Sequence, residues 1–267
     1  MQHLVFTLYA PYGAWGAASA SSATTAYKAT ELEPSRSALI GVLGAALGSQ
    51  RAGLPALDRA LVMAVREILA PRRDLKPDYH TVTPARRPDE RERWTRFEEL
   101  RAHLMGQGKQ GGSILSRREH WTNGLWTVAL VPSAAEGLSI EVLAQALRRP
   151  VWPLYAGRKA CGLGLPPDPE LVLADGPVAA LATYGLPWTR RPALAALLTP
   201  LARAVATTTN SGRLLYDPEY PGAPPSPIRT VTRRDRADDL QQPSGRLFRR
   251  YVVRTQAELP WPAEVLR

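Results

Sequence analysis

The stretch LWTVALVPSAAEGLSIEVLAQALRRP, residues 125–150, decides the fold class because it joins two elements of different kinds. Residues 125–132 are rich in strand-forming side chains and predict a β-strand. Residues 139–149 are typical of a helix, and Pro150 ends it because proline cannot continue the helical hydrogen bonds. The stretch therefore predicts a strand followed by a helix in a protein of mixed α and β structure.

The segments around this stretch complete a regular pattern. Further strands are predicted over residues 3–10, 62–69 and 170–174, and a helix over residues 34–48. Ser35 is the expected N-cap of that helix and Gly48 its expected end. The resulting order β, α, β, β, α, β predicts an α+β fold of the ferredoxin-like, RRM-like type. Its four-stranded sheet is a common RNA-binding platform, but a fold alone does not assign a function.

Two regions depart from a minimal ferredoxin-like domain. An insertion over about residues 72–118 separates the second and third strands, and long ordered loops are usually functional. The region 176–267 begins with helical sequence at 177–184 and 191–204. Strand-like runs then follow at residues 204–209, 213–217, 228–232 and 248–255. We expect a ferredoxin-like domain over residues 1–175, and a helical, then β-rich unit over residues 176–267 packed on it.

The charge balance points to a polyanionic partner. The chain has a formal net charge of +10, and only four of its 34 basic residues are lysine. Arginine adds bidentate phosphate contacts and stacking on bases, so this composition favours a nucleic-acid partner. A codon-driven preference for arginine explains the ratio of arginine to lysine equally well, but it does not explain the net charge. The surplus is concentrated in the middle of the chain and in residues 229–254.

The sequence predicts a cytoplasmic protein that does not enter a membrane. It has no run of about 18 apolar residues, and its N-terminal alternation is typical of a strand instead of a signal peptide. The single cysteine, Cys161, cannot form an internal disulfide, which fits a reducing compartment.

The loop PLYAGRKACGLGL, residues 153–165, is the first candidate for function. Glycine tolerates positive φ and lets another backbone approach closely, so a glycine-rich loop that carries Arg158 and Lys159 fits a phosphate. A tight turn that holds two layers together is the alternative.

The two ends of the insertion supply further candidates. Tyr79 and His80 lie at its base, where flat rings stack on an unpaired base or pack at the root of a hairpin. Arg117 and Arg118 return into the third strand and can neutralise backbone charge. Because adjacent strand residues face opposite sides, we expect one of the two arginines at the surface.

Arg36 and Ser37 open the first predicted helix. An anion can bind there against the free backbone N–H groups of the first turn. Helix capping or a salt bridge is the alternative for this pair.

Six motifs occur in the order found in the Cas5 family. They are LYAPYGAWG (8–16), PSRSALIGVLGAALG (34–48), DYHTV (78–82), SRREHWTNGLWTVAL (116–130), PLYAGRKACGLGLP (153–166) and RRYVV (249–253). The chain resembles this family, and in particular its CasD-type members from type I-E CRISPR Cascade complexes. The resemblance covers essentially the whole chain except the variable C-terminal loops and the last dozen residues.

The resemblance implies a RAMP-superfamily protein that caps one end of a guide ribonucleoprotein. Tyr155, Gly157, Arg158 and Lys159 match the glycine-rich loop that contributes to RNA binding in that superfamily. The insertion resembles the family's thumb, which reaches over the guide RNA. The partners implied are the 5′ handle of the CRISPR RNA, the Cascade backbone and large subunits and, indirectly, target DNA read by guide pairing. No membrane partner is implied.

Catalysis is the alternative function. Metal-independent RNA cleavage needs a base for the 2′-hydroxyl, and histidine is the usual candidate. His80 and His120 remain, because His3 starts a strand and His103 lies in a helix of mixed charge. The resemblance implies that the type I-C branch processes repeat RNA and that the type I-E branch leaves this task to another subunit, so we expect a non-catalytic protein. His120 stands where a tyrosine is expected in close relatives, which keeps a metal-independent endoribonuclease as the alternative.

No metal or cofactor is expected from the sequence. It contains no spaced set of cysteines and histidines, no H-E-x-x-H motif, no phosphate-binding Walker loop and no G-x-G-x-x-G after a strand.

Overall fold

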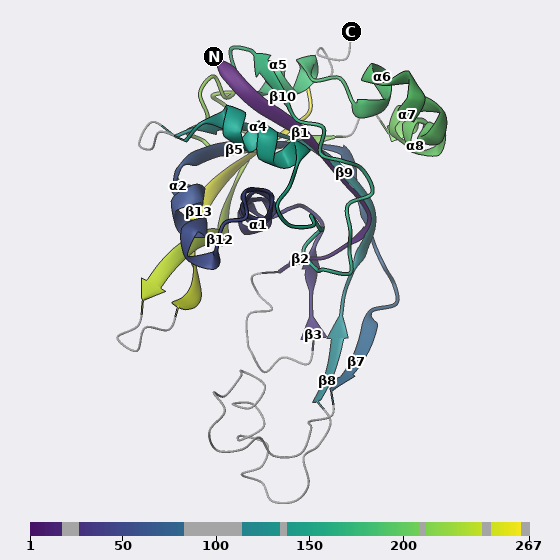
Figure 1. Ribbon diagram of the computed structural model, residues 1–267, viewed down its shortest axis with the longest axis vertical. Coiled ribbons are helices and arrows are strands. Elements are labelled where there is room, and N and C mark those ends of the chain that lie inside the picture. Colours follow the sequence, from purple (N-terminus) through teal and green to yellow (C-terminus); the bar gives the residue numbers. More distant parts are fainter. Residues whose placement is uncertain (18–26, 83–113, 134–137, 209–211, 242–246, 263–267) are drawn as a thin grey trace, which may run out of the picture.

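The computed structural model shows an α+β protein built on one large antiparallel sheet (Figure 1). It describes residues 1–17, 27–82, 114–133, 138–208, 212–241 and 247–262. Most of the predicted insertion, residues 83–113, lies outside the described residues. Among the helices that are described, none combines the length and the apolar character needed to cross a membrane.

The large sheet contains eight strands among the described residues. Seven follow one another in the order β10 (Glu170–Leu173), β1 (Gln2–Gly13), β9 (Trp121–Pro132), β5 (Leu61–Leu69), β11 (Arg213–Tyr216), β13 (Leu247–Pro260) and β12 (Arg229–Gln241). The short strand β6 (Arg72–Arg73) pairs with β9 beside this path. All of these neighbours run antiparallel.

Strand β1 is buried on both faces, which explains its nearly continuous apolar sequence. Leu4 and Phe6 pack with α1 (Arg36–Leu47) and α4 (Ile140–Arg148) on one face, while Val5 packs in a second cluster on the other face. The alternation of side chains along a strand sends neighbours to opposite layers. The predicted first strand, the first helix and the helix before Pro150 are therefore confirmed.

Helix α1 begins and ends as its sequence predicts. The Ser35 side chain accepts a hydrogen bond from the backbone N–H of Ala38, at 3.3 Å. At the other end Gly48 adopts φ 70°, a left-handed conformation that suits glycine. Two short helical segments, η2 (Arg51–Gly53) and α2 (Leu54–Arg59), then lead into β5.

The second face of the sheet is covered by helices from the C-terminal region. These are α5 (Pro177–Thr183), α6 (Pro187–Arg190), α7 (Pro192–Leu197) and α8 (Thr199–Thr208). The strand predicted over residues 204–209 is wrong, because α8 continues to Thr208. Val205 is buried in a cluster with Ile68 and Leu125, so packing of one helical face outweighs the strand preference of valine and threonine.

The C-terminal strands do not form a sheet of their own. Strand β11 pairs with β5, and β13 and β12 continue the same sheet beyond it. Figure 1 shows this sheet curving around α1, with β12 and β13 on one side and β9 on the other. The division into domains at residue 175 stays a prediction.

The base of the insertion forms a separate three-stranded sheet that points away from the large one (Figure 1). Its strands are β7 (Asp78–Val82), β8 (Ile114–Arg118) and β3 (Tyr27–Lys28), with β8 in the centre. A two-stranded pair, β2 (Trp15–Gly16) and β4 (Thr30–Glu31), lies nearby in the chain.

Three tryptophans fill the junction between β1, β2 and β9. The rings of Trp15, Trp121 and Trp126 lie 5.1–5.9 Å apart between centroids and are fully buried. Two glycines make room for them, because a Cβ on Gly13 or Gly124 would lie 2.2 Å from the nearest indole atom. These tryptophans are therefore packing residues of the core.

Candidate nucleic-acid interface

The glycine-rich loop 153–165 is a tight turn seated on the end of β1. Its backbone closes through hydrogen bonds from Ala156 N to Cys161 O, at 2.7 Å, and from Cys161 N to Arg158 O, at 2.8 Å. Gly157 adopts φ +80°, and a Cβ there would lie 1.8 Å from the carbonyl oxygen of Ala14. Only glycine fits this position.

A second glycine brings the end of the loop against the same strand. Gly164 N donates to the carbonyl oxygen of Tyr9 at 2.9 Å, and a Cβ on Gly164 would lie 2.6 Å from the Tyr9 ring. The glycines therefore hold the loop against β1, while Arg158 and Lys159 occupy the turn between them. Lys159 is exposed and makes no ion pair within the described residues.

Arg158 is tied to a buried histidine at the start of β9. Its Nη1 atom lies 2.7 Å from His120 Nε2. The His120 ring is buried and stacks on Tyr12, with 4.3 Å between ring centroids and 18° between planes. The arginine thus lies half-buried at the point where β1, β9 and the glycine-rich loop meet.

Charged groups from the base of the insertion surround this point. Asp78 Oδ2 lies 3.7 Å from His120 Nε2 and 3.5 Å from His80 Nε2. Burial lowers the pKa of Arg158, and the nearby positive charge of Arg118 lowers it further. Two guanidinium groups close together in a partly buried site favour the arrival of an anion.

The small sheet also carries an exposed aromatic side chain next to an arginine. Tyr79 on β7 is directly opposite Arg117 on β8, and the Arg117 guanidinium lies 6.0 Å from the centroid of the Tyr79 ring. Tyr79 is 60% exposed. An exposed ring with a cation beside it is suited to stacking on a single-stranded base.

The root of the small sheet is fixed by one carboxylate. Glu119 accepts hydrogen bonds from Thr30 N at 3.0 Å, from Arg73 Nη1 at 2.8 Å and from the hydroxyl of Tyr27. Burial opposes its charge, but the hydrogen bonds from Tyr27 and Thr30 bring the pKa of Glu119 below its usual value. This residue joins β3, β4 and β6 at the point where β8 leads into β9.

A sequence model described as "CRISPR-associated protein (Cas_Cas5)" matches residues 3–249 of this chain. The chain belongs to the Cas5 family.

Two kinds of relatives accompany this match. "CRISPR system Cascade subunit CasD" of Escherichia coli (strain K12) is 32% identical over 160 residues, which cover 57% of this chain and 64% of that protein. The match thus spans less than two thirds of that relative. A chain from a solved "CRISPR RNA-guided surveillance complex" is 22% identical with a TM-score of 0.57, covering 98% of this Cas5 chain and 92% of its own length. The second similarity shows the fold.

The structure divides the predicted site residues of this Cas5 chain into two groups that adjoin. Arg118, Tyr155, Gly157, Arg158 and Lys159 belong to the glycine-rich loop and its surroundings, and Tyr79, His80 and Arg117 belong to the small sheet. Asp78 links the two groups through its contacts with both histidines. The pairing of β7 with β8 brings together residues that the insertion separates in the sequence.

Arg36 is buried in this Cas5 chain, contrary to its prediction as an RNA-binding residue. Its side chain is 4% exposed and forms ion pairs with Asp58 and Asp217. Its backbone N–H donates to Asp235 Oδ2 at 2.7 Å, so the anion at the start of α1 comes from the protein itself. The neighbouring Ser37 lies half-buried, 3.2 Å from the Ser35 hydroxyl. The salt-bridge alternative is confirmed.

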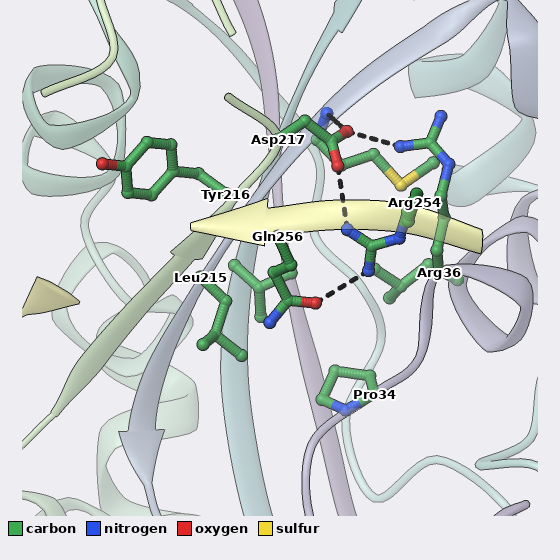
Figure 2. Close-up of a pocket in the computed structure, with 10 residues that line it drawn as sticks. Pro34, Arg36, Leu215, Tyr216, Asp217, Arg254 and Gln256 are labelled. Carbon is green, nitrogen blue, oxygen red and sulfur yellow. Dashed lines mark hydrogen bonds and ion pairs between the residues drawn. The ribbon is translucent and has the colours of Figure 1, made fainter. Parts of the chain in front are cut away.

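Several arginines of the C-terminal region are also paired internally. Arg254 contacts Asp217 at 3.0 Å and Asp235 at 2.7 Å, and Arg213 contacts Glu67 at 3.0 Å. Figure 2 shows Arg36 and Arg254 converging on Asp217 from two sides. Arg213 and Arg254 therefore hold the curved sheet together, and their charges are neutralised there.

The cavity next to these ion pairs is not a ligand site. It has a volume of about 20 Å³ and is lined by residues that include Leu215, Arg254 and Gln256 (Figure 2). This volume accommodates one water molecule but no nucleotide.

Tyr12 and Asp78 are site residues that sequence reasoning missed. Burial, followed by the charges of Asp78 and Asp74, raises the pKa of Tyr12 to about 12, so its ring is a neutral platform for His120. Both residues lie within motifs that carried the family resemblance, LYAPYGAWG and DYHTV. Their contacts depend on the folding of β1 against β9, which no local pattern reveals.

Proposed function

We propose that this Cas5 protein is a non-catalytic subunit of a type I-E CRISPR Cascade surveillance complex. In this role it binds and caps the 5′ handle of the CRISPR RNA and contacts the backbone and large subunits. The observation that carries the proposal is the position of Arg158, which lies on a glycine turn beside Arg118 and His120 at the root of the small sheet. A phosphate bound there relieves the repulsion between the two arginines.

We also infer that the central part of the sheet is a ferredoxin-like domain of the RAMP type. The inference is supported by the lateral order β10, β1, β9, β5, in which each strand–helix–strand unit encloses a strand of the other unit. Helices α1 and α4 share one face of these strands. The RNA is then held at the glycine-rich loop and the small sheet, both of which adjoin the end of β1.

The geometry at His120 favours binding over cleavage. A general base needs a lone pair that reaches the 2′-hydroxyl of the substrate. The residue is 3% exposed, and its Nε2 atom already faces Arg158. His80 is less buried and remains the residue on which the nuclease alternative depends.

The proposal is tested by removing the two cations of the turn. The variant Arg158→Ala with Lys159→Ala is expected to bind RNA that carries the native 5′ handle more weakly. The slope of its affinity against salt concentration on logarithmic axes should fall by about 0.7 for each phosphate that the protein no longer neutralises. Affinities are measured in EDTA on native gels, and the same samples are run on denaturing gels.

A matched control removes two cations elsewhere. Arg51 and Arg203 are exposed and lie on η2 and α8, away from the loop. Arg51→Ala with Arg203→Ala should keep the affinity and salt slope of the wild type. Equal affinity of both double variants, or equal binding of native and scrambled handles by the wild type, argues against the proposal. A discrete cleavage product that His80→Ala abolishes establishes the nuclease instead.

A further inference from the structure

The hydrogen bond between Arg158 and His120 defines the form of the histidine that the site uses. Arg158 Nη1 lies 2.7 Å from His120 Nε2. A guanidinium group has only donors, so Nε2 accepts with its lone pair, and the neutral ring carries its proton on Nδ1. A doubly protonated ring has a donor at Nε2 and cannot make this bond. The contact therefore exists only while His120 is neutral.

The His120 ring is held in place by its surroundings. It stacks on Tyr12, and the Tyr12 hydroxyl is 3.5 Å from Asp74 Oδ2. The backbone N–H of Asp74 donates to the carbonyl oxygen of His120 at 2.9 Å. The ring is thus packed on β1 and on the segment before β7. Arg158 lies on a turn and is less buried than His120, so Arg158 is the partner that is free to move.

We propose that His120 is a positioning residue that holds Arg158 in place for an RNA phosphate while the ring is neutral, and that protonation of the ring releases Arg158. This inference rests on the proposed function, because it explains how one contact of the RNA site is oriented. It adds a proton-dependent control of that contact.

The charged neighbours of His120 come from three directions. Asp78 on β7 and Asp74 before it favour the protonated ring, as does the backbone of Arg118 on β8, whereas Arg158 in the loop opposes it. Burial is the largest effect and Arg158 the second, and together they lower the pKa of His120 below 6.5. Protonation therefore requires a pH below 6.5, and Asp78 is then the nearest acceptor for the new N–H.

The remaining neighbours do not compete for the same proton. Burial raises the pKa of Tyr12 to about 12 and raises that of Cys161 above its usual value, so both stay neutral. His80 shares Asp78 with His120 and requires a control of its own.

The test compares full-length proteins at pH 7.5 and 5.5 and constant salt, with a CRISPR RNA fragment that carries the 5′ handle as the probe. The wild type should lose affinity at pH 5.5, by at most about tenfold and by no more than Arg158→Ala loses at pH 7.5. His120→Gln keeps a neutral acceptor, so it should bind normally at pH 7.5 and lose the pH dependence. His120→Phe keeps the ring stack without an acceptor and should match Arg158→Ala at both values.

Controls separate this inference from the proposed function. His80→Gln should retain the pH profile of the wild type. Wild-type affinity of His120→Phe, or identical pH profiles for His120→Gln and the wild type, overturns the positioning role even when Arg158→Ala weakens binding. Full affinity of Arg158→Ala instead overturns the RNA role of the loop and, with it, this inference.

A measurement without RNA keeps the inference falsifiable if a variant fails to fold. Nitrogen-15 NMR of the wild-type protein at pH 7.5 should show His120 neutral, with its proton on Nδ1. A proton on Nε2 is incompatible with acceptance from Arg158 and overturns the inference.

Discussion

Gly157 shows how much a single residue decides in the loop. Its φ of +80° and the carbonyl of Ala14 leave no room for a side chain. Gly157→Ala should lower the free energy of unfolding by roughly 1–3 kcal/mol and weaken handle binding, because the turn that carries Arg158 must shift. Gly162→Ala is the matched control, since no atom lies within 4 Å of its added Cβ. Equal unfolding curves for the two variants would contradict this account.

The ion-pair partners of Arg36 could not be predicted from the sequence. Its position at the start of a helix allowed an anion site or a salt bridge. Asp58 is 22 residues away and Asp217 is 181 residues away, so no local window contains the deciding partner. The N-cap Ser35, in contrast, acts within one turn and is predictable from the sequence alone.

Among the elements, the hairpin β12–β13 depends on its attachment to α1. Asp235 on β12 accepts from Arg36 N at 2.7 Å and pairs with Arg254 on β13. Asp235→Ala should lower the free energy of unfolding by about 3 kcal/mol, because it removes the acceptor of a helix terminus and one of the two carboxylates that pair with Arg254. Chemical denaturation measures this loss.

The exposed Thr232→Ala on the same strand is the control for this prediction, and it should leave the free energy of unfolding nearly unchanged. Hydrogen exchange localises the effect. Faster exchange in β12 and at the start of α1 is expected, and uniform exchange across the molecule would mean that the hairpin is not anchored at Asp235.

Elements with a clear local pattern are predictable from the sequence, and their lateral partners are not. The predictions for residues 3–10 and 34–48 are correct because alternation and capping are local. The prediction of a strand over residues 204–209 is wrong because valine and threonine favour strands, yet Val205 is buried in a helix. Similarly, Arg158 is a candidate from its glycine neighbours, but its contact with His120 follows from the pairing of β1 with β9.

For the whole molecule, acid is expected to reduce stability through its buried histidines. His3 is buried between Tyr220 and the carbonyl of Ala174, and burial is the main cause that lowers its pKa below 6.5, as it does for His120. Because the unfolded chain binds these protons more readily, stability is complete above pH 6.5 and decreases as the pH falls below that value. The decrease is at most about 1.4 kcal/mol per pH unit for each histidine.

Denaturant titrations between pH 7.5 and 5.5 measure this decrease. The double variant His3→Gln with His120→Gln should flatten the curve, although its absolute stability is lower. A wild-type stability that rises on acidification would show that the two rings are charged in the folded protein.

The three tryptophans at the junction have a practical consequence. Indole rings whose centroids lie 5.1–5.9 Å apart exchange excitation energy and couple their electronic transitions. The glycine-rich loop packs against one of them, since a Cβ on Gly157 would lie 3.4 Å from the Trp15 ring. The protein thus contains an optical probe of its own, and near-ultraviolet circular dichroism can follow the arrival of unlabelled RNA at the loop.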